Sequence, residues 1–120
     1  MLVSPKVLFS AYILKDAKFK RKIFVKVNKY SSKDYIFLND ALDIIYRISF
    51  KGKHKVYNLA SGKKISIKKI AEVLKKKYNA KIMHTNQKIK EYYPQIDNSL
   101  IKKEFKFKPT KDLINYLKSL

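Results

Sequence analysis

The sequence contains no cysteine and no tryptophan, and it has only two glycines among its 120 residues. Without cysteine, disulfide bonds, thiolate nucleophiles and cysteine-ligated zinc are excluded. Gly52 and Gly62 stand too far apart to form the Gly-rich turn that holds a dinucleotide pyrophosphate at a helix N-terminus. His54 and His84 have no Asp or Glu at metal-ligand spacing, so no metal site is predicted.

Long hydrophobic runs are also missing. No uncharged apolar stretch approaches the ~20 residues that a membrane helix needs. Pro5 and Lys6 interrupt the apolar N-terminal segment, and no small-residue cleavage site follows it, which argues against a signal peptide. The sequence therefore predicts a cytoplasmic protein without a membrane partner.

Acidic residues are scarce: 9 Asp and Glu stand against 29 Lys and Arg, a formal net charge of +20. Such a charge is typical of a basic nucleic-acid-binding module, and this class stays open as an alternative. Two observations weaken it, because Arg21 and Arg47 are the only arginines and the lysines are spread along the whole chain. An A/T-rich coding sequence would produce the same excess of lysine, so nucleic acid is not the partner that we expect.

The hydrophobic fraction of 46% is enough for a folded chain, and the length allows one modest core. Helical periodicity and capping residues predict helices at residues 4–18, 39–51, 66–78, 97–104 and 110–120. Alternating apolar residues predict extended segments at 23–27, 34–38, 55–60 and 81–85, with a turn at 61–64. This order predicts an α/β fold, a small mixed sheet with flanking helices, in one domain over residues 1–120.

The helix predicted after Asn39 is apolar around most of its circumference. Leu42, Ile45 and Tyr46 lie at helical spacing, and Ile44 and Ile48 fill the other side. A helix of this kind needs cover on both sides. Gly52 is expected to end it in the left-handed conformation.

Three blocks carry a family resemblance. Residues 32–41 read Ser-Lys-Asp-Tyr-Ile-Phe-Leu-Asn-Asp-Ala, residues 56–62 read Val-Tyr-Asn-Leu-Ala-Ser-Gly, and residues 96–101 read Ile-Asp-Asn-Ser-Leu-Ile, with Phe-Lys-Pro at 107–109. In this order and spacing the blocks resemble the C-terminal third of NAD-dependent sugar-nucleotide epimerases and dehydratases, of the extended short-chain dehydrogenase type. The resemblance implies the substrate-binding C-terminal part of such an enzyme, a single partial domain.

The resemblance also implies what this chain is expected to lack. The family's Gly-rich cofactor turn and its Tyr-x-x-x-Lys pair belong to a Rossmann-type half for which the sequence has no counterpart. No catalytic residue and no cofactor-binding residue is therefore predicted here, and NAD(P) is implied only for the complete enzyme. We expect the Rossmann-type half on a separate chain, or lost by truncation, in which case the chain would be a non-functional remnant. By itself the chain is expected to be inactive.

For the partner, the resemblance implies a nucleotide-diphosphate sugar. Lys33 stands where the family has an arginine on the diphosphate, and a lysine there makes a point-charge contact instead of a bidentate one. Tyr35 stands beside it, Phe24 and Lys26 stand near the position of an aromatic that flanks the base, and Lys88 and Lys90 precede the third block. The implied substrate-binding residues are Lys33, Tyr35, Phe24, Lys26, Lys88 and Lys90. Solvated surface lysines are the competing interpretation for Lys33, Lys88 and Lys90.

Overall fold

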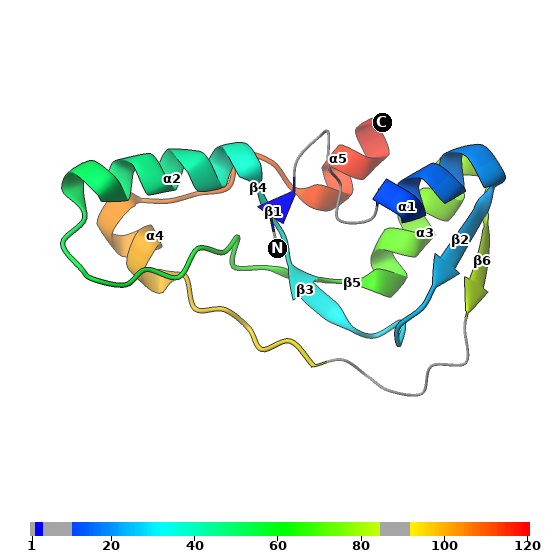
Figure 1. The fold of residues 1–120 in the computed structure, drawn as a ribbon, viewed down its shortest axis with the longest axis horizontal. Helices are drawn as coiled ribbons and strands as arrows, with labels where there is room; N and C mark the ends of the chain where they lie inside the picture. Colours follow the sequence, from blue (N-terminus) through cyan, green and yellow to red (C-terminus); the bar gives the residue numbers. More distant parts are fainter. Residues whose placement is uncertain (1, 4–10, 85–91) are drawn as a thin grey trace.

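The computed structural model describes residues 2–3, 11–84 and 92–120 (Figure 1). The elements, in chain order, are β1 (Leu2–Val3), α1 (Ala11–Lys15), the π-helical segment η1 (Asp16–Lys20), β2 (Lys22–Val25), β3 (Ser32–Asp34), β4 (Ile36–Phe37), α2 (Leu38–Lys51), β5 (Lys64–Ser66), α3 (Ile67–Tyr78), β6 (Lys81–His84), α4 (Ser99–Phe105) and α5 (Leu113–Ser119). The predicted mixed α/β class is confirmed. Residues 4–10 of the first predicted helix lie outside the described residues.

Within the described residues, the strands form three two-stranded sheets. β1 pairs with β4 and β2 pairs with β6, both in parallel, whereas β3 and β5 are antiparallel. Parallel strands normally lie inside larger sheets that are covered on both faces. The β1–β4 and β2–β6 pairs are therefore unusual, because each parallel strand has only one hydrogen-bonded neighbour among the described residues.

The larger core lies between β2, α3 and α5. Ile23 and Val25 alternate on one face of β2, as the sequence predicts, and they join Ile70 and Leu74 of α3 and Leu117 of α5. Each of these side chains is buried. α3 lies between the other two elements, because it packs against both β2 and α5.

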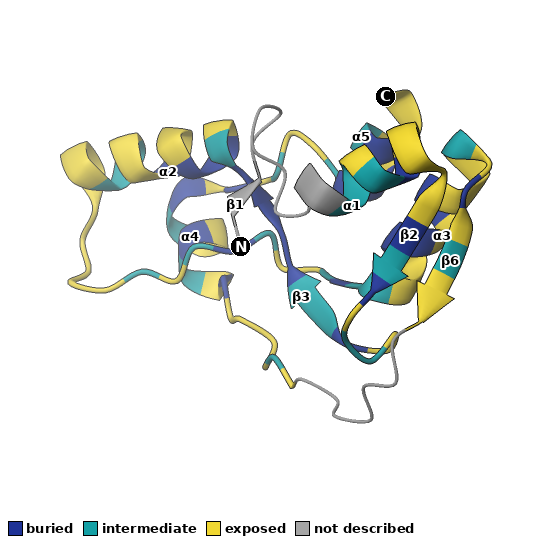
Figure 2. Ribbon diagram, turned by 45° about the vertical axis from the view of Figure 1, so that its right-hand side comes forward, coloured by how far each residue is buried: buried dark blue, intermediate teal, exposed yellow. Residues whose placement is uncertain are grey.

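The second core lies at the other end of the molecule, between α2 and α4 (Figure 2). Ala41 and Ile44 of α2 pack with Ile101 and Phe105 of α4, and Phe107 closes the cluster. Arg47 adds a polar contact because its guanidinium donates to the Phe105 carbonyl. The inward face of α2 is therefore covered by α4, with Ile36 of β4 in the same cluster.

The extended segment through β4 joins the two cores. Tyr35 and Phe37 belong to the larger core, whereas Ile36, between them, belongs to the second. Successive side chains of an extended chain point to opposite sides, so three consecutive apolar residues serve both ends of the molecule. This explains why all three are buried.

The molecule is elongated and thin, with extents of 48 × 30 × 17 Å and a radius of gyration of 16.0 Å. A compact chain of this length would have a radius of gyration of about 14 Å. Figure 1 shows α2 and α4 at one end and α3, β2 and β6 at the other. The chain thus encloses two small cores, one toward each end, and not one central core.

Two helix N-termini follow the predicted capping. The Ser66 hydroxyl oxygen accepts a hydrogen bond from the Lys69 N–H at 3.1 Å, and the Asp112 carboxylate accepts one from the Asn115 N–H at 3.0 Å. The helix predicted at residues 39–51 is present as α2, but its predicted cap, Asn39, is wrong. The helix begins at Leu38, and Phe37 occupies the capping position. Asn39 is instead inside the first turn.

The strand predicted at residues 55–60 is absent, and β5 lies at residues 64–66, where the turn was expected to end. Tyr57 and Leu59 alternate inward against the second core, and Val56, directly before Tyr57, is 75% exposed. A strand requires a neighbour with which to share backbone hydrogen bonds. The apolar alternation is present here without such a neighbour.

Gly52 ends α2 for a reason that differs from the predicted one. Its backbone is extended, with φ −66° and ψ 133°, so the expected left-handed conformation is wrong. A Cβ at this position would lie 2.5 Å from the Ile48 carbonyl oxygen and 3.1 Å from the Tyr57 hydroxyl. Glycine is therefore required here because the Ile48 carbonyl and the Tyr57 hydroxyl lie too close for a side chain.

Substituting Gly52→Ala is expected to lower the free energy of unfolding by about 1–3 kcal/mol, because the new methyl group overpacks against backbone. Urea denaturation of the 120-residue chain would measure the change. Lys51→Ala is the matched control, since its side chain is exposed and should change stability by less than about 0.5 kcal/mol. Equal urea midpoints for the two variants would contradict this explanation of Gly52.

Candidate functional site

The first and second sequence blocks meet at a carboxylate. Asp34, at the end of β3, is buried, and its two oxygens accept hydrogen bonds from the Ser61 and Gly62 N–H groups, each at 2.8 Å. Charge-assisted bonds of this kind are about twice as strong as neutral ones. Asp34 thus fixes the turn that leads into β5.

The third block reaches the same turn from the other side. The buried Asn98 side-chain amide donates to the Ala60 carbonyl at 3.0 Å, and the Asn58 amide donates to the Asp97 carbonyl at 3.1 Å. Gly62 has φ +89°, and a Cβ there would lie 2.9 Å from the Asn98 amide nitrogen. Only glycine suits both this backbone conformation and this approach.

A separate contact joins the first block to the segment before α5. Asp40, buried in the first turn of α2, accepts hydrogen bonds from the Thr110 N–H at 3.0 Å and from the Thr110 hydroxyl at 2.5 Å. All three blocks are therefore held to one another by side-chain hydrogen bonds. The structure brings together what the sequence only places in order.

Beside this junction lies a cluster of two lysines and two tyrosines, here called the Lys33 cluster: Lys33, Lys64, Tyr92 and Tyr93. The Lys33 ammonium lies 4.4 Å from the centre of the Tyr93 ring. The Lys64 ammonium donates to the Tyr93 carbonyl at 2.5 Å and lies 5.5 Å from the Tyr92 ring. Ammonium groups held against aromatic faces form a surface that can attract a phosphate and stack a ring.

Tyr35 adjoins the same cluster. Burial, and to a smaller extent the neighbouring Tyr93, raises the pKa of Tyr35 to about 12. The Tyr35 side chain also lines a cavity of about 350 Å³ together with Thr110 and Asp112. Lys33 and Tyr35, both predicted from the resemblance, are thus brought to one place through Tyr93.

The other predicted residues lie elsewhere or outside the described residues. Phe24 is half-buried on β2, opposite Met83 of β6, and the exposed Lys26 follows the strand. Phe24 and Lys26 thus belong to the β2–β6 pair and the residue that follows it, whereas Lys33 and Lys64 belong to the β3–β5 pair. Lys88 and Lys90 lie outside the described residues.

Sequence reasoning missed Lys64 and Tyr93. Lys64 was assigned to a turn, whereas it pairs with Asp34 in the β3–β5 register. Tyr93 stands in a stretch that carried no strong pattern, four residues before Asp97. The adjacent aromatic pair at 92–93, directly ahead of the third block, was the signal that could have found it.

Among the residues that the structure describes, no group of three or more His, Asp and Glu side chains could hold a metal ion. No helix in the described part of the chain has the length and apolar character to cross a membrane.

The Tyr35→Phe variant should alter the pH dependence of stability. The pKa of Tyr35 in the folded chain, about 12, lies above the ordinary value of 10.0, so folding favours the neutral phenol. Stability from this preference is complete below about pH 10 and is lost as the pH rises through about 12. Between pH 10 and pH 12 the wild-type chain should lose about 2 kcal/mol more than Tyr35→Phe, as measured by urea unfolding at each pH. If the free energy of unfolding fell equally with pH in the wild-type chain and in Tyr35→Phe, the raised pKa of Tyr35 would be refuted.

Comparison with known proteins identifies the class of fold. No family model matches the sequence, and no curated protein matches it. The structure, in contrast, matches over nearly its whole length a portion of the NAD-dependent sugar-nucleotide dehydratases and epimerases of the extended short-chain dehydrogenase type. The predicted similarity of fold to these enzymes is confirmed.

Three solved structures illustrate the match. For dTDP-glucose 4,6-dehydratase from Bacillus anthracis, solved with NAD, the TM-score is 0.81 at 17% identity, over 98% of this chain and 40% of that one. For ADP-L-glycero-D-manno-heptose-6-epimerase from Helicobacter pylori, the TM-score is 0.78 at 16% identity, over 98% and 39%. For UDP-glucose 4-epimerase from Thermotoga maritima, solved with UDP-glucose, the TM-score is 0.73 at 17% identity, over 88% and 36%. This chain therefore spans about 40% of the length of the enzymes that it resembles in fold.

Proposed function

We propose that this chain supplies the nucleotide-sugar-binding part of an NAD(P)-dependent epimerase or dehydratase. In this proposal residues 1–120 form one partial domain in the cytoplasm, and a Rossmann-type half holds the cofactor and carries the catalytic groups. The Lys33 cluster binds the diphosphate, with Lys33 and Lys64 as point charges and with Tyr92 and Tyr93 as the ring faces beside them.

The observation that carries the proposal is the junction of the three blocks. Asp34 binds the turn at Ser61 and Gly62, and Asn98 closes the same turn from the third block. The contacts place Lys33, one residue before Asp34, next to Tyr93, which comes shortly before the third block. Solved neighbours of similar fold act on nucleotide sugars, and one of them was solved with UDP-glucose.

The exposed face of α2 supports the requirement for a companion half. Leu42, Ile45, Tyr46 and Phe50 are 54%, 45%, 65% and 73% exposed, on the side of α2 that does not contact α4. Most of α2 is coloured as exposed in Figure 2. Adjacent apolar side chains of this kind mark a surface that another protein element covers. The Rossmann-type half is the element that we propose, since β1 and β4 are a parallel pair that a larger sheet would extend.

Calorimetric titration of the chain with UDP-glucose and dTDP-glucose tests the proposal. Lys33→Ala should weaken binding by about tenfold, because a charge-assisted phosphate contact contributes about 1.4 kcal/mol or more. Lys33→Arg should bind more tightly than wild type, since a guanidinium makes a bidentate contact. Lys102→Ala, an exposed lysine of α4, is the control and should leave the affinity unchanged.

Two results would overturn the proposal. Equal affinities for wild type, Lys33→Ala and Lys102→Ala would show that Lys33 does not meet the ligand. No heat for either nucleotide sugar, with the chain folded, is what a non-functional remnant predicts.

A further inference from the structure

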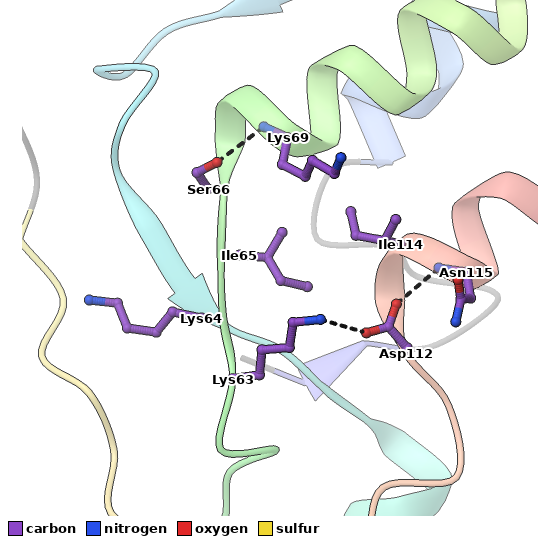
Figure 3. A pocket seen from close by; sticks show the side chains of 8 residues that line it. All are labelled: Lys63, Lys64, Ile65, Ser66, Lys69, Asp112, Ile114 and Asn115. Carbon is purple, nitrogen blue, oxygen red and sulfur yellow. Dashed lines mark hydrogen bonds and ion pairs between the residues drawn. The ribbon is translucent and has the colours of Figure 1, made fainter.

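Three adjoining cavities lie along α3 and α5, at the end of the molecule away from α2. The cavity in Figure 3, of about 460 Å³, lies between β5, the first turn of α3 and the start of α5. It shares Lys63 and Asp112 with the cavity of about 350 Å³ before α5, and it shares Lys69 with a third one of about 500 Å³ between α3 and α5. Because neighbouring cavities share lining residues, the three adjoin one another and are here together called the α3–α5 groove.

Lysines dominate the lining of the α3–α5 groove. Those that line it are Lys63, Lys69, Lys76, Lys77, Lys108, Lys111 and Lys118. Lys64 also borders the cavity of Figure 3, but its side chain points away from the cavity and donates to the Tyr93 carbonyl. The lysines are distant in sequence and come from three segments of the chain, so the fold gathers charge that the sequence spreads out.

The carboxylates of the groove are already engaged. Asp112 lies 3.5 Å from the Lys63 ammonium and also caps α5, and Glu72 lies 4.0 Å from the Lys68 ammonium. The apolar lining residues Ile65, Val73 and Ile114 are buried, so they form the floor of the groove and not an exposed patch. The groove is consequently a strongly positive channel with little exposed apolar surface.

The spacing of the lysines suits a chain of phosphates. Lys69 and Lys76 are seven residues apart on α3, a rise of about 10.5 Å along the helix. One strand of DNA advances 3.4 Å along the duplex axis for each phosphate, so a helix aligned with that axis spans about three phosphates over this distance. Lysine ammonium groups neutralise phosphates as point charges and do not read base edges. An anionic bilayer fits less well, because membrane-surface helices bury an exposed apolar face that this groove lacks.

We infer that the α3–α5 groove binds the phosphate backbone of a nucleic acid without reading its sequence. The inference does not depend on the proposed function. The groove belongs to the larger core, whereas the exposed face of α2 lies beside the second core, so both surfaces can be occupied at once. The Lys33 cluster borders the groove at Tyr35, which lines the cavity of about 350 Å³, but Lys64 at this boundary points away from the groove.

Fluorescence anisotropy with a short labelled DNA duplex, titrated between about 50 and 200 mM salt, tests the inference. The test variant is Lys69→Gln, Lys76→Gln and Lys77→Gln together. The matched control is Lys51→Gln, Lys53→Gln and Lys55→Gln, which removes the same charge from exposed positions at the far end of α2. In a plot of log affinity against log salt, the test variant should reduce the slope by about 2.7, or 0.9 for each lost phosphate contact. The control should keep the wild-type slope.

Equal slopes for wild type and test variant would overturn the inference, and so would equal reductions in the two variants, which would indicate only bulk charge. Tighter binding to phosphatidylserine vesicles than to the duplex would also overturn it, in favour of a membrane surface. Circular dichroism would establish that both variants fold. Should the triple variant fail to fold, Lys69→Gln alone, with an expected slope change of about 0.9, replaces it.

Discussion

Replacing Asp34 with alanine is expected to lower the free energy of unfolding by about 3 kcal/mol, measured by urea denaturation. The Asp34 carboxylate accepts two charge-assisted hydrogen bonds from the turn at Ser61 and Gly62. Each such bond contributes about 1.5–3 kcal/mol, and alanine leaves both N–H groups without this acceptor. Since folded chains are stable by only about 5–15 kcal/mol, the loss is a large share of the total.

The control for Asp34 is Asp43→Ala. Asp43 is exposed and makes one ion pair with Arg47 at 3.6 Å, one turn along α2, so its removal should cost less than about 0.5 kcal/mol. Asp34→Asn should fall between the two, because one amide oxygen can still accept a hydrogen bond. A loss at Asp34 no larger than that at Asp43 would mean that the turn does not depend on the carboxylate.

The second large effect is expected on the exposed face of α2. Burying Leu42, Ile45, Tyr46 and Phe50 in an interface would be favourable by about 5 kcal/mol, given their exposed fractions. Alone, the chain should therefore bind a hydrophobic dye and self-associate. The triple variant Leu42→Gln, Ile45→Gln and Phe50→Gln should lower dye fluorescence several-fold and elute as a monomer, with α2 intact because glutamine favours helices.

A matched variant separates this face from scattered apolar residues. Met83→Gln and Leu120→Gln change side chains that are 37% and 41% exposed on other elements, and dye binding should persist. A wild-type chain that is monomeric, melts sharply and binds no dye would contradict the proposed docking surface. In that case the requirement for a companion half would also lose its main support.

Parts of the site could be predicted because they depend on local chemistry. The cap of α3 by Ser66 and the inward alternation of Ile23 and Val25 on β2 follow from capping and period-two patterning. Residues 55–60 have equally good alternation and form no strand, since strand formation also needs a hydrogen-bonding neighbour. Lys64 was misplaced for the same reason, because the β3–β5 register that sets it opposite Asp34 is a long-range property.

The sequence by itself determined the mixed α/β class, the order of the three blocks and the largely apolar character of α2, because these depend on residue type and spacing. Only the tertiary structure decided which residues meet. It placed Tyr93 beside Lys33, fixed the turn at Gly62 with Asp34, and gathered dispersed lysines into the α3–α5 groove. The physical reason is that hydrogen bonds and charge contacts act over a few ångströms in space. Two residues that make such a contact can be far apart in the sequence, and their separation along the chain does not reveal it.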